Sequence, residues 1–224
     1  MPEIKFRLIR SNRRTVGLEV NDQGDLIVRA PNRLELSAIK SILTSHRRWI
    51  ARKLSEVERR RQLLRPKRFA EGENFLYLGR EFPLLISHET RPALRFTGQS
   101  FILSARWQGQ AREIFQKWYR KQAQAYLSDR VMKLAVSNGF RFKKFRLSSA
   151  RTRWGSCSAK RMISLTWRLI LAPPEIIDYV IVHELAHTRE KSHSRDFWTL
   201  VAGLMPDYRQ KRRWLKQNGF MLNV

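Results

Sequence analysis

Cysteine, glycine, proline and acidic residues are all scarce in this sequence. Cys157 is the single cysteine among 224 residues, which excludes an intrachain disulfide framework and suits a reducing compartment. Ten glycines and eight prolines, without a period, exclude the fibrous repeat classes. With 42% hydrophobic and 11% aromatic residues, the chain still has enough apolar material for a core, which argues against disorder.

Long apolar runs are missing as well. The most apolar stretch, residues 163–182, is interrupted by charged residues and prolines, so we predict no membrane span. The first ten residues, MPEIKFRLIR, carry charges where a secretory signal has its apolar segment. We therefore expect a soluble cytoplasmic protein.

The shortage of acidic residues leaves a large positive charge. Lys and Arg number 45 against 19 Asp and Glu, a formal net charge of +26, and residues 139–161 hold eight Lys or Arg and no acid. Solubility does not require such an imbalance, so the charge indicates a polyanionic partner. Nucleic acid is the commonest such partner, and an acidic protein or an anionic membrane surface are the alternatives.

The basic segment 139–161 is the candidate nucleic-acid-binding region. Its aromatic residues alternate with basic ones and could stack on bases while the cations hold phosphates. The same alternation is typical of a half-buried strand with a basic solvent face, which we favour for the aromatic residues. The candidate nucleic-acid-binding residues are Arg141, Lys143, Lys144, Arg146, Arg151 and Arg153.

The pattern of elements predicts two regions with a boundary near residue 105. Residues 1–105 read as a β-rich region with one helix: strands within 4–31, a helix over 34–64, and further strands between 75 and 105. Residues 106–224 begin with a long helix over 110–137. We expect its buried face to consist of Ala111, Ile114, Trp118, Ala125, Met132 and Val136.

The rest of the second region carries two strands and further helices. Strands are predicted over 145–150 and 162–170, on either side of a loop at 153–158 that we interpret as a structural hairpin loop. A helix opens at Pro173 and Pro174, and helical pattern continues to about 217, with a break near Met205.

The strongest chemical signal is the sequence His183-Glu184-Leu185-Ala186-His187 within that helix. Histidines four residues apart lie one turn apart on the same face, so both imidazoles can reach one metal ion. Glu184 follows the first ligand and can accept a proton from a water molecule on the metal. His46 and His88 have no such company and are not predicted to be ligands.

His193 is the third candidate ligand. On a continuous helix it would point roughly 240° away from His187 and lie ~9 Å further along. It can join the same metal only if the chain turns after Thr188, and Ser192 or Ser194 could cap the next helix. Three neutral imidazoles with one open position predict a single catalytic Zn²⁺. Candidates for stabilising an oxyanion are Arg153, Arg168 and Tyr179.

These residues resemble a known family. The stretches R-W-G-S-C-S from Arg153, I-S-L-T-W-R-L-I-L-A-P-P-E-I-I-D-Y-V-I-V-H-E-L-A-H from Ile163 and S-H-S-R-D-F-W from Ser192 resemble the YgjP-like metallopeptidases, which are relatives of the SprT/Spartan-type zincins. The close similarity covers about residues 151–200.

The resemblance implies an α+β fold with a zincin-like metallopeptidase core, in which the active-site helix packs on a small antiparallel sheet. It implies zinc ligands at His183, His187 and His193, with Glu184 as general base. It makes the segment before the helix the edge strand that pairs with an extended peptide substrate. SprT/Spartan-type relatives act on proteins attached to DNA, which would account for the charge.

Three functions are compatible with this sequence. The first is a zinc metallopeptidase that hydrolyses peptide bonds in proteins, including nucleic-acid-associated ones. The second is a basic nucleic-acid-binding module whose zinc site is structural or vestigial, although such a site has no use for Glu184. The third is a zinc hydrolase of nucleic acid itself, but phosphodiester hydrolysis usually employs carboxylate-rich two-metal sites. We favour the metallopeptidase.

Overall fold

The computed structural model describes residues 5–21, 23–63 and 66–224. The chain divides into two compact units, Met1–Arg65 and Pro66–Val224, and each has a hydrophobic core of its own. The division predicted at residue 105 falls inside the second unit, because the strands before that residue share a core with the helices after it.

The first unit packs two helices on a three-stranded sheet. Its strands are β1 (Arg7–Ser11), β2 (Gly17–Val20) and β3 (Leu26–Pro31), and its helices are α1 (Leu36–Ser45) and α2 (Arg47–Leu63). Strand β3 is central, parallel to β1 and antiparallel to β2. The helix predicted over 34–64 is thus divided at His46, and the ends of two predicted elements, Ile4 and Leu64, lie outside the described residues.

The second unit begins with a four-stranded sheet of order β4-β5-β7-β6. Its strands are β4 (Asn74–Tyr77), β5 (Arg80–Ser87), β6 (Leu94–Phe96) and β7 (Phe101–Ser104), followed by a short 3-10 helix, η1 (Ala105–Gln110). Phe75 of β4 stacks on Phe115 of the next helix with ring centroids 4.3 Å apart. This contact is one reason why the predicted boundary does not separate two cores.

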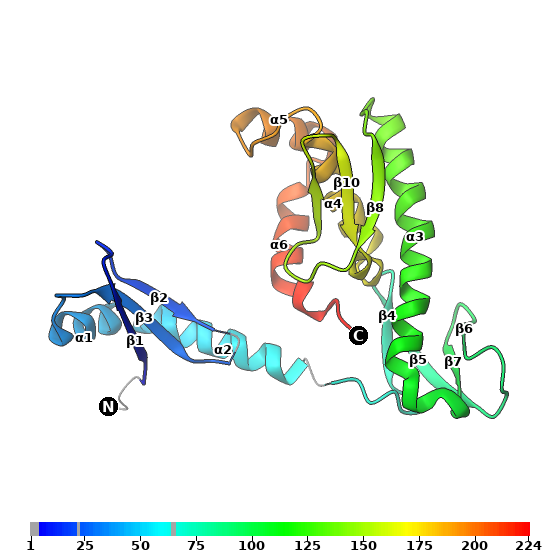
Figure 1. The fold of residues 1–224 in the computed structure, drawn as a ribbon, viewed down its shortest axis with the longest axis horizontal. Coiled ribbons are helices and arrows are strands. Elements are labelled where there is room, and N and C mark those ends of the chain that lie inside the picture. Colours follow the sequence, from blue (N-terminus) through cyan, green and yellow to red (C-terminus); the bar gives the residue numbers. More distant parts are fainter. Residues whose placement is uncertain (1–4, 22, 64–65) are drawn as a thin grey trace. The chain divides into compact units, whose positions relative to one another are not determined.

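Helix α3 (Ala111–Ser137) is the long helix predicted from the sequence. Its buried face differs from the one predicted: Met132 and Val136 are 55% and 73% exposed, and Ala125 is exposed too. The buried residues recur every fourth position, and because a turn holds 3.6 residues, this stripe winds slowly around the helix. They are Ala111, Phe115, Tyr119, Ala123, Leu127, Val131 and Ala135. Figure 1 shows α3 running beside both sheets of this unit, which explains the winding stripe.

The second sheet of this unit has three strands in the order β8-β10-β9. They are β8 (Lys144–Ser148), β9 (Gly155–Cys157) and β10 (Met162–Thr166). The predicted antiparallel sheet is wrong in one respect: β8 and β10 are parallel, and only β9 and β10 are antiparallel. The strand that precedes the helix with His183 and His187, β10, lies in the centre of the sheet, so it is not the edge strand that the resemblance implied.

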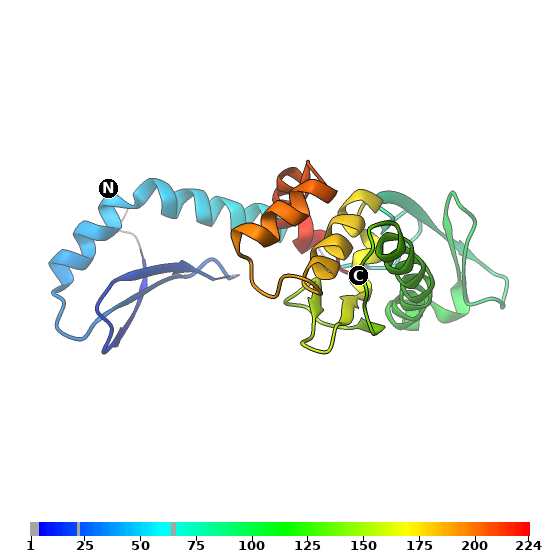
Figure 2. The ribbon, with the colours of Figure 1, turned by 90° about the horizontal axis from the view of Figure 1, so that it is seen from above.

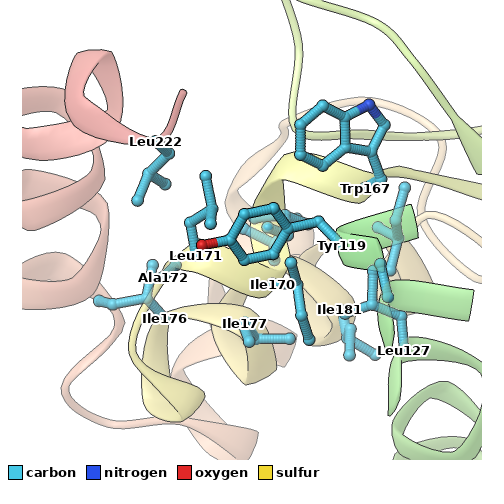
Figure 3. Close-up of a cluster of buried hydrophobic side chains, with 14 of the residues drawn as sticks. Tyr119, Leu127, Trp167, Ile170, Leu171, Ala172, Ile176, Ile177, Ile181 and Leu222 are labelled. Atoms are coloured by element: carbon cyan, nitrogen blue, oxygen red, sulfur yellow. The ribbon is translucent and has the colours of Figure 1, made fainter. Parts of the chain in front are cut away.

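The remaining helices carry the candidate site. After the 3-10 helix η2 (Trp167–Leu171) come α4 (Pro174–Ala186), α5 (Arg195–Leu204), α6 (Tyr208–Asn218) and the 3-10 helix η3 (Gly219–Met221). Figure 2 shows α4 between α3 on one side and α5 and α6 on the other. Figure 3 shows the core that holds α4, to which α3, η2 and the C-terminal segment contribute Tyr119, Ile170 and Leu222. In the described part of the chain, no helix is both long and apolar enough to cross a membrane.

Candidate metal centre

Helix α4 and the turn after it position the three histidines. Pro174 begins the helix, Glu175 lies in its first turn where the helix dipole favours a carboxylate, and His187 is the residue that ends it. The chain then turns, with the Thr188 hydroxyl donating to the Leu185 carbonyl at 2.7 Å. This turn directs the chain back, so that His193 can reach the end of α4.

The cap of α5 fixes the position of His193. The Ser194 hydroxyl accepts a hydrogen bond from the Phe197 amide at 3.3 Å, as expected for an N-cap residue, and His193 directly precedes it. Of the two serines that the sequence offered, the structure therefore uses Ser194. The predicted helix, turn and helix around the third histidine are confirmed.

The Nε2 atoms of the three histidines converge. His193 Nε2 lies 3.0 Å from His183 Nε2 and 3.2 Å from His187 Nε2, so each histidine offers one nitrogen to a common point. The Nδ1 atom of His187 lies 3.0 Å from the Glu190 carbonyl, to which it can donate, and that tautomer leaves Nε2 with a free lone pair. The arrangement fits a cation, since three converging lone pairs otherwise repel one another.

Burial favours the neutral form of two of these imidazoles, those of His183 and His193. It lowers the pKa of His183 to about 3, with His187 and His193 adding to the effect, and it also lowers the pKa of His193. Aromatic rings of α5 hold two of the histidines in place: His187 stacks on Phe197 with centroids 4.4 Å apart, and His193 stacks on Trp198 at 5.6 Å. A neutral imidazole in a fixed orientation is the form that binds a metal ion.

Glu184 shares a cavity of about 680 Å³ with the three histidines. The side chain is buried, and this burial raises the pKa of its carboxyl to about 7, while the charge of Arg153 acts in the opposite direction. Gly155 of β9 faces it so closely that a Cβ there would lie 2.6 Å from the Glu184 Cγ atom. The position of Glu184 therefore depends on a glycine at residue 155, which lies within the predicted hairpin loop 153–158.

Strand β9 forms another wall of this cavity. Gly155, Ser156 and Cys157 line it, so the loop predicted at 153–158 is a strand in its middle part. Burial raises the pKa of the Cys157 thiol, with the Glu184 carboxylate contributing. Cys157 therefore lines the cavity mainly as an uncharged thiol.

Basic side chains are among those lining the cavity, and sequence reasoning missed most of them. Arg153 was a candidate, whereas Arg161, Arg189 and Lys191 were not. Arg189 is held in place because its guanidinium donates to the Gly139 carbonyl at 2.7 Å. Of the three residues considered for stabilising an oxyanion, Arg153 is among those lining the cavity. Tyr179 is buried beside the site, with its ring centroid 6.0 Å from that of His183, and Arg168 is buried against Trp167.

The six candidate nucleic-acid-binding residues are exposed, but they do not form one site around the metal centre. Lys144 and Arg146 lie on the solvent face of β8, while Phe145 and Leu147 pack against the core. The interpretation as a half-buried strand with a basic face is confirmed for β8, whereas Phe140 and Phe142 precede the strand. Of the six, only Arg153 lines the cavity; the others are Arg141, Lys143, Lys144, Arg146 and Arg151.

The fold and the site together define a mixed α+β protein with a three-histidine centre that could hold a metal ion. Residues 14–218 match the YgjP-like family, described as a metallopeptidase domain. The chain therefore belongs to the YgjP-like metallopeptidase family, as its resemblance indicated, and this membership implies a metal ion.

Two individual proteins are also similar to this chain. The UTP pyrophosphatase of Escherichia coli (strain K12) is 35% identical over 72 residues, which make up 30% of this chain and 43% of that relative. Less than half of that relative's length is thus matched. The metallopeptidase zymogen of Pyrococcus abyssi abylysin is 21% identical with a TM-score of 0.37, covering 41% of this chain and 93% of that one.

Proposed function

We propose that this protein is a zinc-dependent metallopeptidase in which Glu184 is the general base. The observation that carries the proposal is that Glu184 and three converging histidine Nε2 atoms share one cavity, beside the edge of a sheet. Three imidazoles without a thiolate or carboxylate ligand are typical of a catalytic zinc site.

Each residue would have a defined task. His183, His187 and His193 would hold the zinc ion, which when bound supplies a Lewis acid and a more acidic water molecule. A carboxylate oxygen of Glu184 would take a proton from the attacking water and later deliver it to the leaving amine. Gly155 would leave the space in which this side chain lies.

Strand β9 offers a place for an extended peptide. Thr166 N donates to Trp154 O at 2.9 Å, and Ser158 N donates to Met162 O at 3.0 Å. Because hydrogen-bonded pairs alternate in an antiparallel ladder, the backbone groups of Gly155 and Cys157 point away from β10. They lie on the cavity side of the sheet and can pair with a substrate strand.

The charge of the protein supports a polyanion-associated substrate. A formal net charge of +26 would bring the enzyme to nucleic acid, so proteins bound to nucleic acid are the proposed substrates. In the second hypothesis, a basic nucleic-acid-binding module with a structural zinc site, the same charge would serve binding alone.

A second candidate reaction is the hydrolysis of a nucleoside triphosphate. It is favoured by the cations that line the cavity, Arg153, Arg161, Arg189 and Lys191, and by the activity named for the Escherichia coli relative. Guanidinium and ammonium groups suit a triphosphate, and the same Glu184 could activate water against a phosphoanhydride.

Two variants test the role of the metal centre. We expect Glu184→Gln to retain one zinc ion per chain and to lose turnover by roughly a hundredfold or more, because it cannot accept a proton. We expect His183→Ala to lose the zinc ion as well. Zinc content is measured by atomic emission. Turnover is measured in two assays: cleavage of a protein substrate with and without DNA, and release of pyrophosphate from UTP.

The substrates decide between the functions. Cleavage of protein by the wild type but not by Glu184→Gln supports the peptidase. Faster cleavage in the presence of DNA supports a nucleic-acid-associated substrate. Pyrophosphate release without proteolysis supports the second candidate reaction. Equal turnover by Glu184→Gln and the wild type would refute the role of Glu184, and a zinc-loaded protein inactive on every substrate would favour the binding module.

A further inference from the structure

Three arginines lie at or near the turn that follows β8, close enough for Arg120 and Arg151 to affect the charge of Arg168. Arg120 of α3 donates from its Nη2 to the Ser149 hydroxyl, and Arg168 of η2 donates from its Nη1 to the Ser149 carbonyl at 3.2 Å. Arg151 lies two residues further along the same turn. We call Arg120, Arg151 and Arg168 the arginine cluster. None of its members is among the residues that line the metal-centre cavity.

Arg168 is the unusual member. Only 9% of its surface is exposed, and its guanidinium lies 4.6 Å from the centre of the Trp167 ring. Buried arginines are almost always paired with a carboxylate, because an unpaired charge is costly to bury. Across the ion pairs of the described residues, none includes a member of the arginine cluster. Burial and the charges of Arg151 and Arg120 together lower the pKa of Arg168.

The neighbouring sequence offers no compensating acid. Residues 114–128 of α3, 139–161 around the turn and 162–172 of β10 and η2 contain neither Asp nor Glu. Three guanidinium groups around one turn therefore lack a negative partner within the segments that form it. A tetrahedral phosphate, with about two negative charges and several acceptor oxygens, matches several guanidinium forks better than one carboxylate does.

We propose that the arginine cluster is a phosphate-binding site, separate from the metal centre. A phosphate would accept hydrogen bonds from those guanidinium N–H groups of the cluster that do not donate to Ser149. It would also neutralise the buried charge of Arg168. The proposal holds whichever reaction the metal centre performs.

The test is calorimetric titration of the full-length protein with inorganic phosphate and with pyrophosphate, at constant ionic strength. The variant is Arg120→Gln with Arg151→Gln, since both side chains are exposed and their replacement leaves the core intact. The matched control, Arg80→Gln with Arg106→Gln, removes two exposed charges of the same unit that belong neither to the arginine cluster nor to the lining of the metal-centre cavity. We expect phosphate affinity to fall roughly tenfold or more in the cluster variant and to change less than about twofold in the control.

A thermal measurement tests Arg168 itself. Replacing chloride by phosphate at equal ionic strength should raise the melting temperature of the wild type, and Arg168→Met should abolish this increase. If Arg168→Met does not fold, the exposed double variant decides. The proposal is overturned if the wild type binds no phosphate, if the control loses as much affinity as the cluster variant, or if only the control loses it.

A final arm identifies the source of the phosphate group. A fluorescent single-stranded oligonucleotide is titrated against the wild type and the cluster variant, with and without competing inorganic phosphate. Weaker oligonucleotide binding by the variant, with competition, assigns the site to backbone phosphates. If both proteins bind the oligonucleotide equally and only the cluster variant has lost phosphate affinity, the site is assigned to a small phosphate compound.

Discussion

Gly155 and Glu184 are adjacent across the cavity, and the space between them is too small for another side chain. A Cβ at residue 155 would lie 2.6 Å from the Glu184 Cγ and 2.7 Å from its Oε1. We expect Gly155→Ala to displace the Glu184 carboxylate and to lower turnover at least tenfold, because the position of a general base determines its efficiency. Zinc content should stay at one ion per chain, since no metal ligand contacts residue 155 in this way.

The matched control is Gly203→Ala in α5. A Cβ there meets nothing within 4 Å, so activity should be unchanged, and stability should rise by up to about 1 kcal/mol because alanine favours a helix. Turnover and urea denaturation are measured for both variants. Full activity of Gly155→Ala would show that Glu184 can shift without loss, and that the close approach has no role in catalysis.

At the scale of elements, the Arg130–Asp178 ion pair joins α3 to α4. Arg130 Nε and Nη2 donate to the two Asp178 carboxylate oxygens at 2.6 and 2.7 Å, and this bond raises the pKa of the guanidinium. Because Arg130 is 36% exposed, solvent weakens the pair. We expect Asp178→Asn to lower the free energy of unfolding by about 1–2 kcal/mol in urea denaturation.

The control substitution is Asp129→Asn, which removes the ion pair between Asp129 and Lys133. These two side chains are 59% and 64% exposed. Its effect should be below about 0.5 kcal/mol. Equal effects of the two substitutions would mean that the bidentate geometry between helices contributes nothing beyond a surface pair.

The elements also show what the sequence could and could not predict. The three-histidine centre could be predicted because its residues are close in sequence. His183 and His187 are four residues apart, and a serine that caps α5 lies beside His193. The parallel pairing of β8 with β10 could not be predicted from the sequence, since the strand pattern is the same for parallel and antiparallel neighbours. Strand β9 has only three residues, too few for a periodic pattern to distinguish it from a loop.

The prediction of the buried face of α3 was wrong for a related reason. The expected face assumed a straight apolar stripe, whereas the helix contacts different elements along its length, so the buried positions shift around it. The close approach of Gly155 to Glu184 depends on tertiary packing between β9 and α4, for which no local signal exists. Sequence spacing thus predicted the three histidines that converge, and packing determined the wall that surrounds them.

At the scale of the whole molecule, the metal centre and its supporting core belong to one unit. Every residue of the larger hydrophobic core lies between Phe69 and Val224, as do Glu184 and the three histidines. We expect the fragment 66–224 to unfold cooperatively in urea and to bind one zinc ion per chain. A fragment that is unfolded, or folded without zinc, would show that residues 1–65 are needed for this unit.

The charge of the whole molecule gives the last prediction, which concerns nucleic acid. Each phosphate that the protein neutralises contributes roughly 0.7 to 0.9 to the slope of log affinity against log salt concentration. Reversing Lys143, Lys144 and Arg146 to glutamate changes the net charge from +26 to +20, because each reversal changes it by two. If this basic face of the sheet contacts nucleic acid, the slope should decrease by about two to three units, and binding at low salt should weaken strongly.

Reversing Arg80, Arg91 and Arg106, which are exposed elsewhere in the same unit, removes the same charge and should have a much smaller effect. Fluorescence anisotropy with a labelled oligonucleotide at several salt concentrations measures both slopes, and identical slopes would assign the binding to the overall charge rather than to this surface.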